Sequence, residues 1–233
     1  MIRVTVWNEY LHERELPEIA AVYPDGIHAQ IASFLNEFSD LEVRCATMQD
    51  PEQGLSEEIL SSTDVMIYWA HCAHDQIDDV NVARLAEHIR NGMGFIALHS
   101  AHYSKILRSI LGTSMTLSWK DDDSERLFVT APYHPIAAGV DNLIELPEEE
   151  LYGEYFDIPK PDDIIFTGWF KSGAVFRSGV TFTRGNGKIF YFQPGHEAYP
   201  IYYHPQIQKI ITNAVYWAAP SNRLITSRDN IAL

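Results

Sequence analysis

The chain has 233 residues, of which 46% are hydrophobic and 21% charged, a composition typical of a globular protein and unlike that of a disordered one. Its 32 acidic residues outnumber 17 basic ones, and the formal net charge is −15. A field of that sign repels phosphate groups, which argues against nucleic acid and anionic membranes as partners. We expect one domain over residues 1–220, followed by a polar C-terminal tail at 221–233.

The N-terminal sequence and the cysteine content indicate the compartment. Met1–Val6 enters a strand pattern directly and lacks the basic start and long apolar core of a signal peptide. No apolar run reaches the roughly 18 residues of a membrane span. The two cysteines, Cys45 and Cys72, are too few for a disulfide framework. These features favour a reduced, cytoplasmic location.

Strand and helix patterns alternate through the first half of the chain. Residues 64–70 are nearly all apolar, as expected of a strand covered on both faces, and the apolar residues of 27–38 recur at helical spacing. Strands are predicted at 2–7, 41–45, 64–70 and 94–98, and helices at 27–38, 54–61, 82–91 and 106–111. Such an order predicts an α/β fold with a parallel sheet and right-handed crossovers.

Strand signals become denser after residue 114. Further strands are predicted at 115–119, 127–130, 143–145 and 164–170, then a hairpin pairing 179–184 with 188–192 around Gly185-Asn186-Gly187, and a helix at 204–218. The acidic clusters Asp121–Asp123 and Glu148–Glu150 are interpreted as solvated loop faces.

Polar side chains gather where the predicted parallel strands end. In an open α/β sheet, ligands bind outside the carboxyl ends of the strands. Five of the ten histidines fall at such ends, whereas His28, His88, His134 and His204 are interpreted as structural. The residues expected at this edge are Asn8, Glu9, His12, His71, His74, Asp75, His99, Ser100 and His102, together with 193–197 after the hairpin.

This concentration of imidazoles indicates a metal site. Neutral imidazole is a favoured zinc ligand, and a catalytic zinc usually takes three protein ligands and leaves one position open. His99, His196 and one carboxylate could supply them, although the spacing matches no compact zinc motif. His74, Asp75 or Glu9 could then transfer protons.

Covalent catalysis is the alternative to a metal site for the turn that carries His99. Leu98–His102 occupies the strand-to-helix position of a nucleophile elbow. The residue at its tip, His99, has the small residues Ala97 and Ala101 two positions away on either side, as such a turn requires. An imidazole stands at the tip in place of a thiol or hydroxyl, which disfavours acyl chemistry. Cys72 is a further nucleophile candidate, but neighbouring residues on a strand, such as His71 and Cys72, point in opposite directions.

Several motifs together resemble the trehalose-utilisation (ThuA-like) family over roughly residues 3–219. The motifs are Trp7–Tyr10 with His12-Glu13, Tyr23–His28, Trp69–His71, Ala97–Ser100, His134–Gly139, Glu150–Glu154 and Gln193–Glu197. The resemblance implies a class I glutamine amidotransferase-like fold, a flavodoxin-like three-layer sandwich with a central, mostly parallel sheet. It places His99 where those enzymes carry the cysteine nucleophile, and makes His196-Glu197 similar to the end of their triad. Glutaminase activity is therefore not expected.

The resemblance also implies a function in trehalose or related disaccharide catabolism, including action on keto-sugars. The matched Glu154 becomes the expected carboxylate, so that His99, Glu154 and His196 would bind zinc or another divalent metal and, with His74, carry the catalysis. The expected substrate-binding residues are Asn8, Glu9, His12, Trp69, His71, Ser100, His102 and Tyr152, with Tyr152, Tyr155 and Trp69 able to stack on a sugar.

Two questions remain open at this point: whether the protein is an enzyme, and whether it forms oligomers. The same fold could serve as a non-catalytic carbohydrate-binding or regulatory module. The aromatic residues near the C-terminus, Tyr202, Tyr203 and Trp217, suggest self-association as a homo-oligomer.

Overall fold

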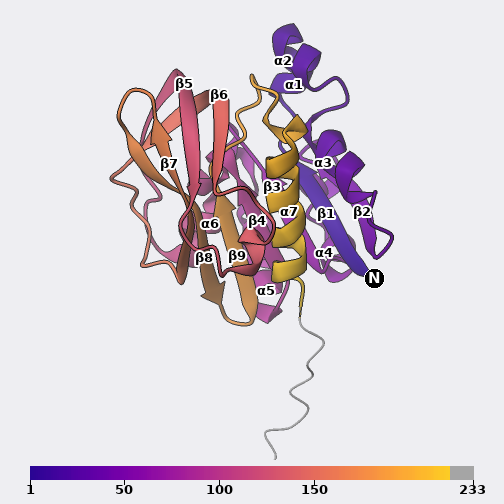
Figure 1. Cartoon of the computed structure of the whole chain (residues 1–233). Coiled ribbons are helices and arrows are strands. Elements are labelled where there is room, and N and C mark those ends of the chain that lie inside the picture. The colour runs from indigo at the N-terminus through magenta and orange to yellow at the C-terminus, as the bar shows by residue number, and fades with distance from the viewer. Residues whose placement is uncertain (221–233) are drawn as a thin grey trace, which may run out of the picture.

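The structure is a computed structural model that describes residues 1–220; the tail expected at 221–233 lies outside the described residues. Its centre is one nine-stranded sheet with the order β2-β1-β3-β4-β9-β8-β7-β5-β6 (Figure 1). The α-helices are α1 (His12–Glu15), α2 (Pro17–Val22), α3 (Ile27–Leu35), α4 (Glu57–Ser61), α5 (Asp79–Asn91), α6 (Lys105–Leu111) and α7 (Pro205–Ala218). Within residues 1–220, no helix is both long and apolar enough to cross a membrane.

Half of the sheet is parallel. It consists of β2 (Leu41–Thr47), β1 (Ile2–Asn8), β3 (Val65–Trp69), β4 (Gly94–Leu98) and β9 (Gly187–Phe192), paired in that order. All five residues of β3 and of β4 are buried. Residues of α3 and α7 share one apolar core with this half, and residues of α4, α5 and α6 share the core on its other face. The predicted α/β alternation is therefore confirmed.

The remaining four strands are antiparallel, so the sheet is mixed and the expected parallel arrangement is found only in part of it. Beyond β9 lie β8 (Val175–Arg184), β7 (Asp163–Phe170), β5 (Ser118–Val129) and β6 (Leu143–Gly153), and each pairs with its neighbour in antiparallel register. No crossover helix joins these four strands, and connections without one favour antiparallel pairing.

Two predictions for this half need correction. The separate strands expected near 115–119 and 127–130 are one strand, β5, whose middle shifts register against β6 on either side of Asp123. Such a bulge interrupts the two-residue periodicity that marks a strand in a sequence. Glu149 and Glu150 are buried within β6 and are not part of a solvated loop.

The order of the parallel strands determines where the polar residues that follow each strand come together. Because β1, β3, β4 and β9 are adjacent and parallel, their carboxyl ends lie side by side at one edge. Chain segments starting at Asn8, His71, His99 and Gln193 leave the sheet there. The predicted convergence of these distant segments is thus produced by the topology.

Candidate functional site

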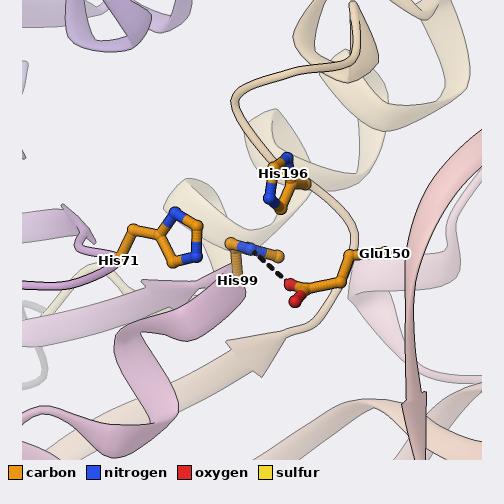
Figure 2. Close-up of side chains that lie close together, drawn as sticks. All are labelled: His71, His99, Glu150 and His196. Atoms are coloured by element: carbon orange, nitrogen blue, oxygen red, sulfur yellow. Dashed lines mark ion pairs between the residues drawn. The ribbon is translucent and has the colours of Figure 1, made fainter. Parts of the chain in front are cut away.

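Four side chains converge at this edge. One potential ligand atom from each of His71, His99, Glu150 and His196 lies within 4.8 Å of the others. His71 follows β3, His99 follows β4, Glu150 belongs to β6, and His196 lies in the loop after β9. Figure 2 shows the three rings and the carboxylate pointing toward one another. The cluster therefore joins the two halves of the sheet.

His99 is fixed at the base of the cluster. It is fully buried, and its φ of 54° gives the turn after β4 the left-handed backbone that is rare outside glycine. Its Nδ1 donates a hydrogen bond to the carbonyl oxygen of Gln193 (3.2 Å), so in the neutral ring Nε2 carries the lone pair. This Nε2 lies 3.1 Å from Glu150 Oε2, an oxygen that has no hydrogen-bond partner among the described residues. A nitrogen lone pair facing a buried carboxylate oxygen is the arrangement that a cation would stabilise.

His71 presents its Nε2 in the same way. Its Nδ1 donates to Glu197 Oε1 (2.5 Å), and this oxygen also accepts from His12 Nδ1 (2.5 Å). Burial alone would raise the pKa of Glu197, but the hydrogen bonds from the two rings hold this pKa well below its usual range. A buried carboxylate behind a histidine fixes the tautomer and orientation of a metal ligand.

His12, His71 and Glu197 could also be read as a second metal site, but their spacing argues otherwise. Ligand atoms around one zinc ion, with bonds of roughly 2.0–2.1 Å, lie about 3 Å or more apart. The 2.5 Å separations here are those of charge-assisted hydrogen bonds. We therefore interpret Glu197 as a support for His71.

Glu150 supplies the carboxylate of the cluster. Its side chain is only 5% exposed. Burial raises its pKa, but the nearby His99 ring, with smaller contributions from His196 and His71, outweighs burial and lowers this pKa below its ordinary value. The Gln193 side-chain amide donates to the Glu150 carbonyl oxygen (3.1 Å), which ties β6 to the end of β9.

Glu154 does not belong to the cluster. Its carboxylate forms a two-pronged pair with Arg177 (2.7 and 2.8 Å) and accepts from the backbone N–H of Phe156. Residue types alone could not separate Glu150 from Glu154. One usable signal was present: Glu150 runs directly into the apolar pair Leu151-Tyr152, which indicates a continuing strand.

His196 differs from the other two histidines in its hydrogen bonding. The backbone N–H of Ala198 donates to His196 Nδ1 (3.0 Å), so Nδ1 is unprotonated and Nε2 carries the proton. Burial lowers the pKa of His196 to about 4, so the ring is neutral at pH 7. A neutral Nε2–H is a hydrogen-bond donor, and it is not available as a metal ligand in that form.

The loop that carries His196 is held from behind. Glu149, a fully buried side chain, accepts from the backbone N–H of Gly195 (2.9 Å) and of His196 (3.3 Å). Gly195 has a φ of 139°, and a Cβ there would lie 2.0 Å from the hydroxyl of Tyr202, so only glycine fits.

Several predicted substrate-binding residues instead fix the conformation of loops, because their side chains form hydrogen bonds within the protein. Glu9 accepts from the backbone N–H groups of His71, Cys72 and Ala73 (2.9–3.1 Å), and Asn8 donates to Glu13 (2.7 Å). Trp69 is 1% exposed, which leaves no face for a sugar, and its indole N–H donates to the Gly195 carbonyl oxygen (3.0 Å).

A cavity of about 520 Å³ opens beside the cluster. His71, Glu150 and His196 form part of its wall, as do the predicted residues His74, Ser100, His102 and Tyr152. The Tyr152 hydroxyl lies 2.6 Å from Ser100 Oγ and 3.5 Å from His99 Nε2. Burial lowers the pKa of His74 to about 4 and that of His102 to about 3, so both rings are neutral at pH 7.

Cys72 lies close to this site but is poorly suited to be a nucleophile. Its thiol donates to Glu9 Oε1 (3.0 Å), and His12 Nε2 lies 3.5 Å away. Burial and the Glu9 carboxylate raise the pKa of Cys72 to about 12. The thiolate, which is the reactive form, is therefore scarce at neutral pH.

Comparison with known proteins places the chain in a family. Residues 3–218 match the family model described as trehalose utilisation, ThuA. The chain belongs to the trehalose-utilisation family. No curated protein sequence matches it significantly.

Solved structures similar to this member of the trehalose-utilisation family share its fold. A protein assigned as ThuA-like from Parabacteroides merdae is 15% identical with a TM-score of 0.67, covering 93% of this chain and 89% of that one. A cytoplasmic protein from Salmonella typhimurium is 13% identical with a TM-score of 0.64, covering 94% and 100%. A protein from Thermoplasma acidophilum, assigned to GMP synthase, is 12% identical with a TM-score of 0.52, covering 93% of each.

Proposed function

We propose that this trehalose-utilisation family member is a metal-dependent enzyme that acts on a disaccharide or a keto-sugar. The observation that carries the proposal is the convergence of His71 Nε2, His99 Nε2 and the Glu150 carboxylate beside a cavity of about 520 Å³. Two imidazoles and one carboxylate with open positions suit zinc or another divalent metal. The unpartnered, buried Glu150 Oε2 fits such an ion.

The roles of the residues follow from their hydrogen bonds. A divalent ion at this position would polarise a carbonyl oxygen or activate water. His196 would donate its Nε2 proton to a sugar oxygen, because its Nδ1 is occupied by Ala198. Neutral His74, on the cavity wall, would accept a proton from the substrate. His12, Glu197 and Glu9 would orient His71 from behind.

The first experiment measures metal content by mass spectrometry in the purified wild-type chain and in single variants. His71→Ala, His99→Ala and Glu150→Ala should lose the metal. Glu154→Gln is the matched control, since Glu154 pairs with Arg177 and should not affect the metal. Retention of metal in the three alanine variants would refute the ligand set.

The second experiment separates catalysis from binding. A disaccharide and its keto form are incubated with the metal-loaded protein, and the sugars are followed by NMR. Chemical conversion that is lost in His99→Ala supports an enzyme. Retention of the sugar without any chemical change would favour the non-catalytic carbohydrate-binding module instead.

A further inference from the structure

We propose that Trp119 and Tyr103 form a subsite for a second, uncharged sugar ring, in the part of the cavity away from the histidine cluster. This inference rests on the proposed function, because it assigns the substrate as a neutral disaccharide. Both aromatic side chains line the same cavity as His71, Glu150 and His196.

The sheet register separates Trp119 from the cluster by one residue, Tyr152. Trp119 of β5 is paired with Tyr152 of β6. Directly paired residues project to the same side of a sheet, with Cβ atoms about 4.5–5.5 Å apart. The Tyr152 ring stacks on His99 with ring centres 5.3 Å apart. Tyr152, on the edge strand β6, thus lies between His99 and Trp119 of the neighbouring strand β5.

The exposure of Trp119 is unusual for its residue type. At 63% it is the most exposed of the five tryptophans, although Trp7 and Trp69 are fully buried. An exposed aromatic alone has no functional meaning. Here the indole forms the wall of a cavity, where the apolar C–H face of a sugar ring could cover it and remove that surface from water.

Tyr103 supplies a second aromatic surface, held in place by its neighbours. The Arg108 guanidinium lies 4.5 Å from the centre of the Tyr103 ring and forms an ion pair with Asp75 (2.9 Å). The His74 ring contacts Tyr103 edge to face, with centres 5.9 Å apart. A ring fixed in this way loses little conformational entropy when a ligand covers it.

The polar groups of the cavity select an uncharged ligand. Asp121, Thr116 and His102 can exchange hydrogen bonds with sugar hydroxyls. None of the twelve residues that line the cavity within the described chain is lysine or arginine. Two of them are acidic, and the whole chain carries a formal charge of −15. The Arg108 guanidinium beside Tyr103 is already paired with Asp75, so Asp121 would repel a phosphate or carboxylate on the second sugar ring.

The test is calorimetric titration of the metal-loaded wild type, Trp119→Ala and Trp119→Phe with trehalose, glucose and trehalose 6-phosphate. We expect Trp119→Ala to weaken trehalose binding roughly two- to tenfold, the range for one aromatic contact, and to leave glucose binding unchanged. Trp119→Phe should retain most of the affinity. Trp169→Ala is the matched control, because Trp169 is also exposed but does not line the cavity.

Four results would overturn the subsite. Three of them are unchanged trehalose affinity in Trp119→Ala, an equal loss of glucose affinity, and tighter binding of the phosphorylated sugar than of trehalose. The fourth is failure of the wild type to bind trehalose. Metal content, measured in the same samples, reports separately on the proposed function, since Trp119→Ala leaves His71, His99 and Glu150 intact.

Discussion

Replacement of Glu125 by glutamine should change how stability depends on pH. Glu125 of β5 is fully buried near the end of β9; its Oε1 accepts from Ser178 Oγ (2.8 Å), and its Oε2 has no partner among the described residues. Ser178 in turn accepts, through its carbonyl oxygen, the Gln193 N–H that begins the loop to His196 (2.7 Å). Burial raises the pKa of Glu125 from 4.5 to about 8.

The sign and size of the effect follow from proton binding. Between pH 4.5 and about 8 the folded chain keeps the Glu125 proton while the unfolded chain has released it, so stability falls as pH rises. Each factor of ten in proton affinity corresponds to about 1.4 kcal/mol, so the difference between about 8 and 4.5 amounts to roughly 5 kcal/mol across this window. Glutamine has no proton to release and escapes this loss.

Urea unfolding at pH 5, 6, 7 and 8 measures the difference directly. Relative to the wild type, Glu125→Gln should gain about 1.4 kcal/mol of unfolding free energy per pH unit between pH 5 and 8. Glu149 is buried nearby and contributes its own pH dependence to both proteins. The exposed Glu148→Gln serves as the control and should follow the wild type. If the unfolding free energies of Glu125→Gln and the wild type change by the same amount between pH 5 and pH 8, the reasoning is refuted.

Three further predictions concern the site. Glu197→Gln should weaken metal binding about 10- to 100-fold, because the carboxylate orients His71, whereas unchanged affinity in a competition titration would remove that role. His196→Gln should keep the metal but reduce turnover roughly 10²- to 10⁴-fold, the range for loss of a proton donor, and loss of the metal would instead make His196 a ligand. Cys72→Ser should retain turnover in the same assay, since a thiol with a pKa of about 12 is not ionised at neutral pH; an inactive serine variant would restore the nucleophile hypothesis.

The parallel half of the fold could be predicted from local patterns. The unbroken apolar run at 64–70 and the helical spacing at 27–38 each specify one element, and their alternation specifies a parallel sheet. That sheet in turn brings His71 and His99 to one edge, as the sequence indicated.

The carboxylate could not be assigned in the same way. Glu150 is the last of three consecutive glutamates, and such runs are usually solvated. It is buried only because β6 pairs with the bulged strand β5 and reaches the end of β9 through Gln193. The roles of Trp69 and Glu9 were hidden for a similar reason, since their partners are backbone groups of distant loops. Contacts of this kind leave no periodic pattern in a sequence.

The most direct test of the central claim is to locate the metal by anomalous diffraction from crystals of the metal-loaded protein. The arrangement predicts one ion bound by His71 Nε2, His99 Nε2 and the Glu150 carboxylate at about 2.0–2.2 Å, with His196 outside bonding distance. An ion bound by His12 and Glu197, or crystals soaked in zinc that show no anomalous peak at the cluster, would contradict it.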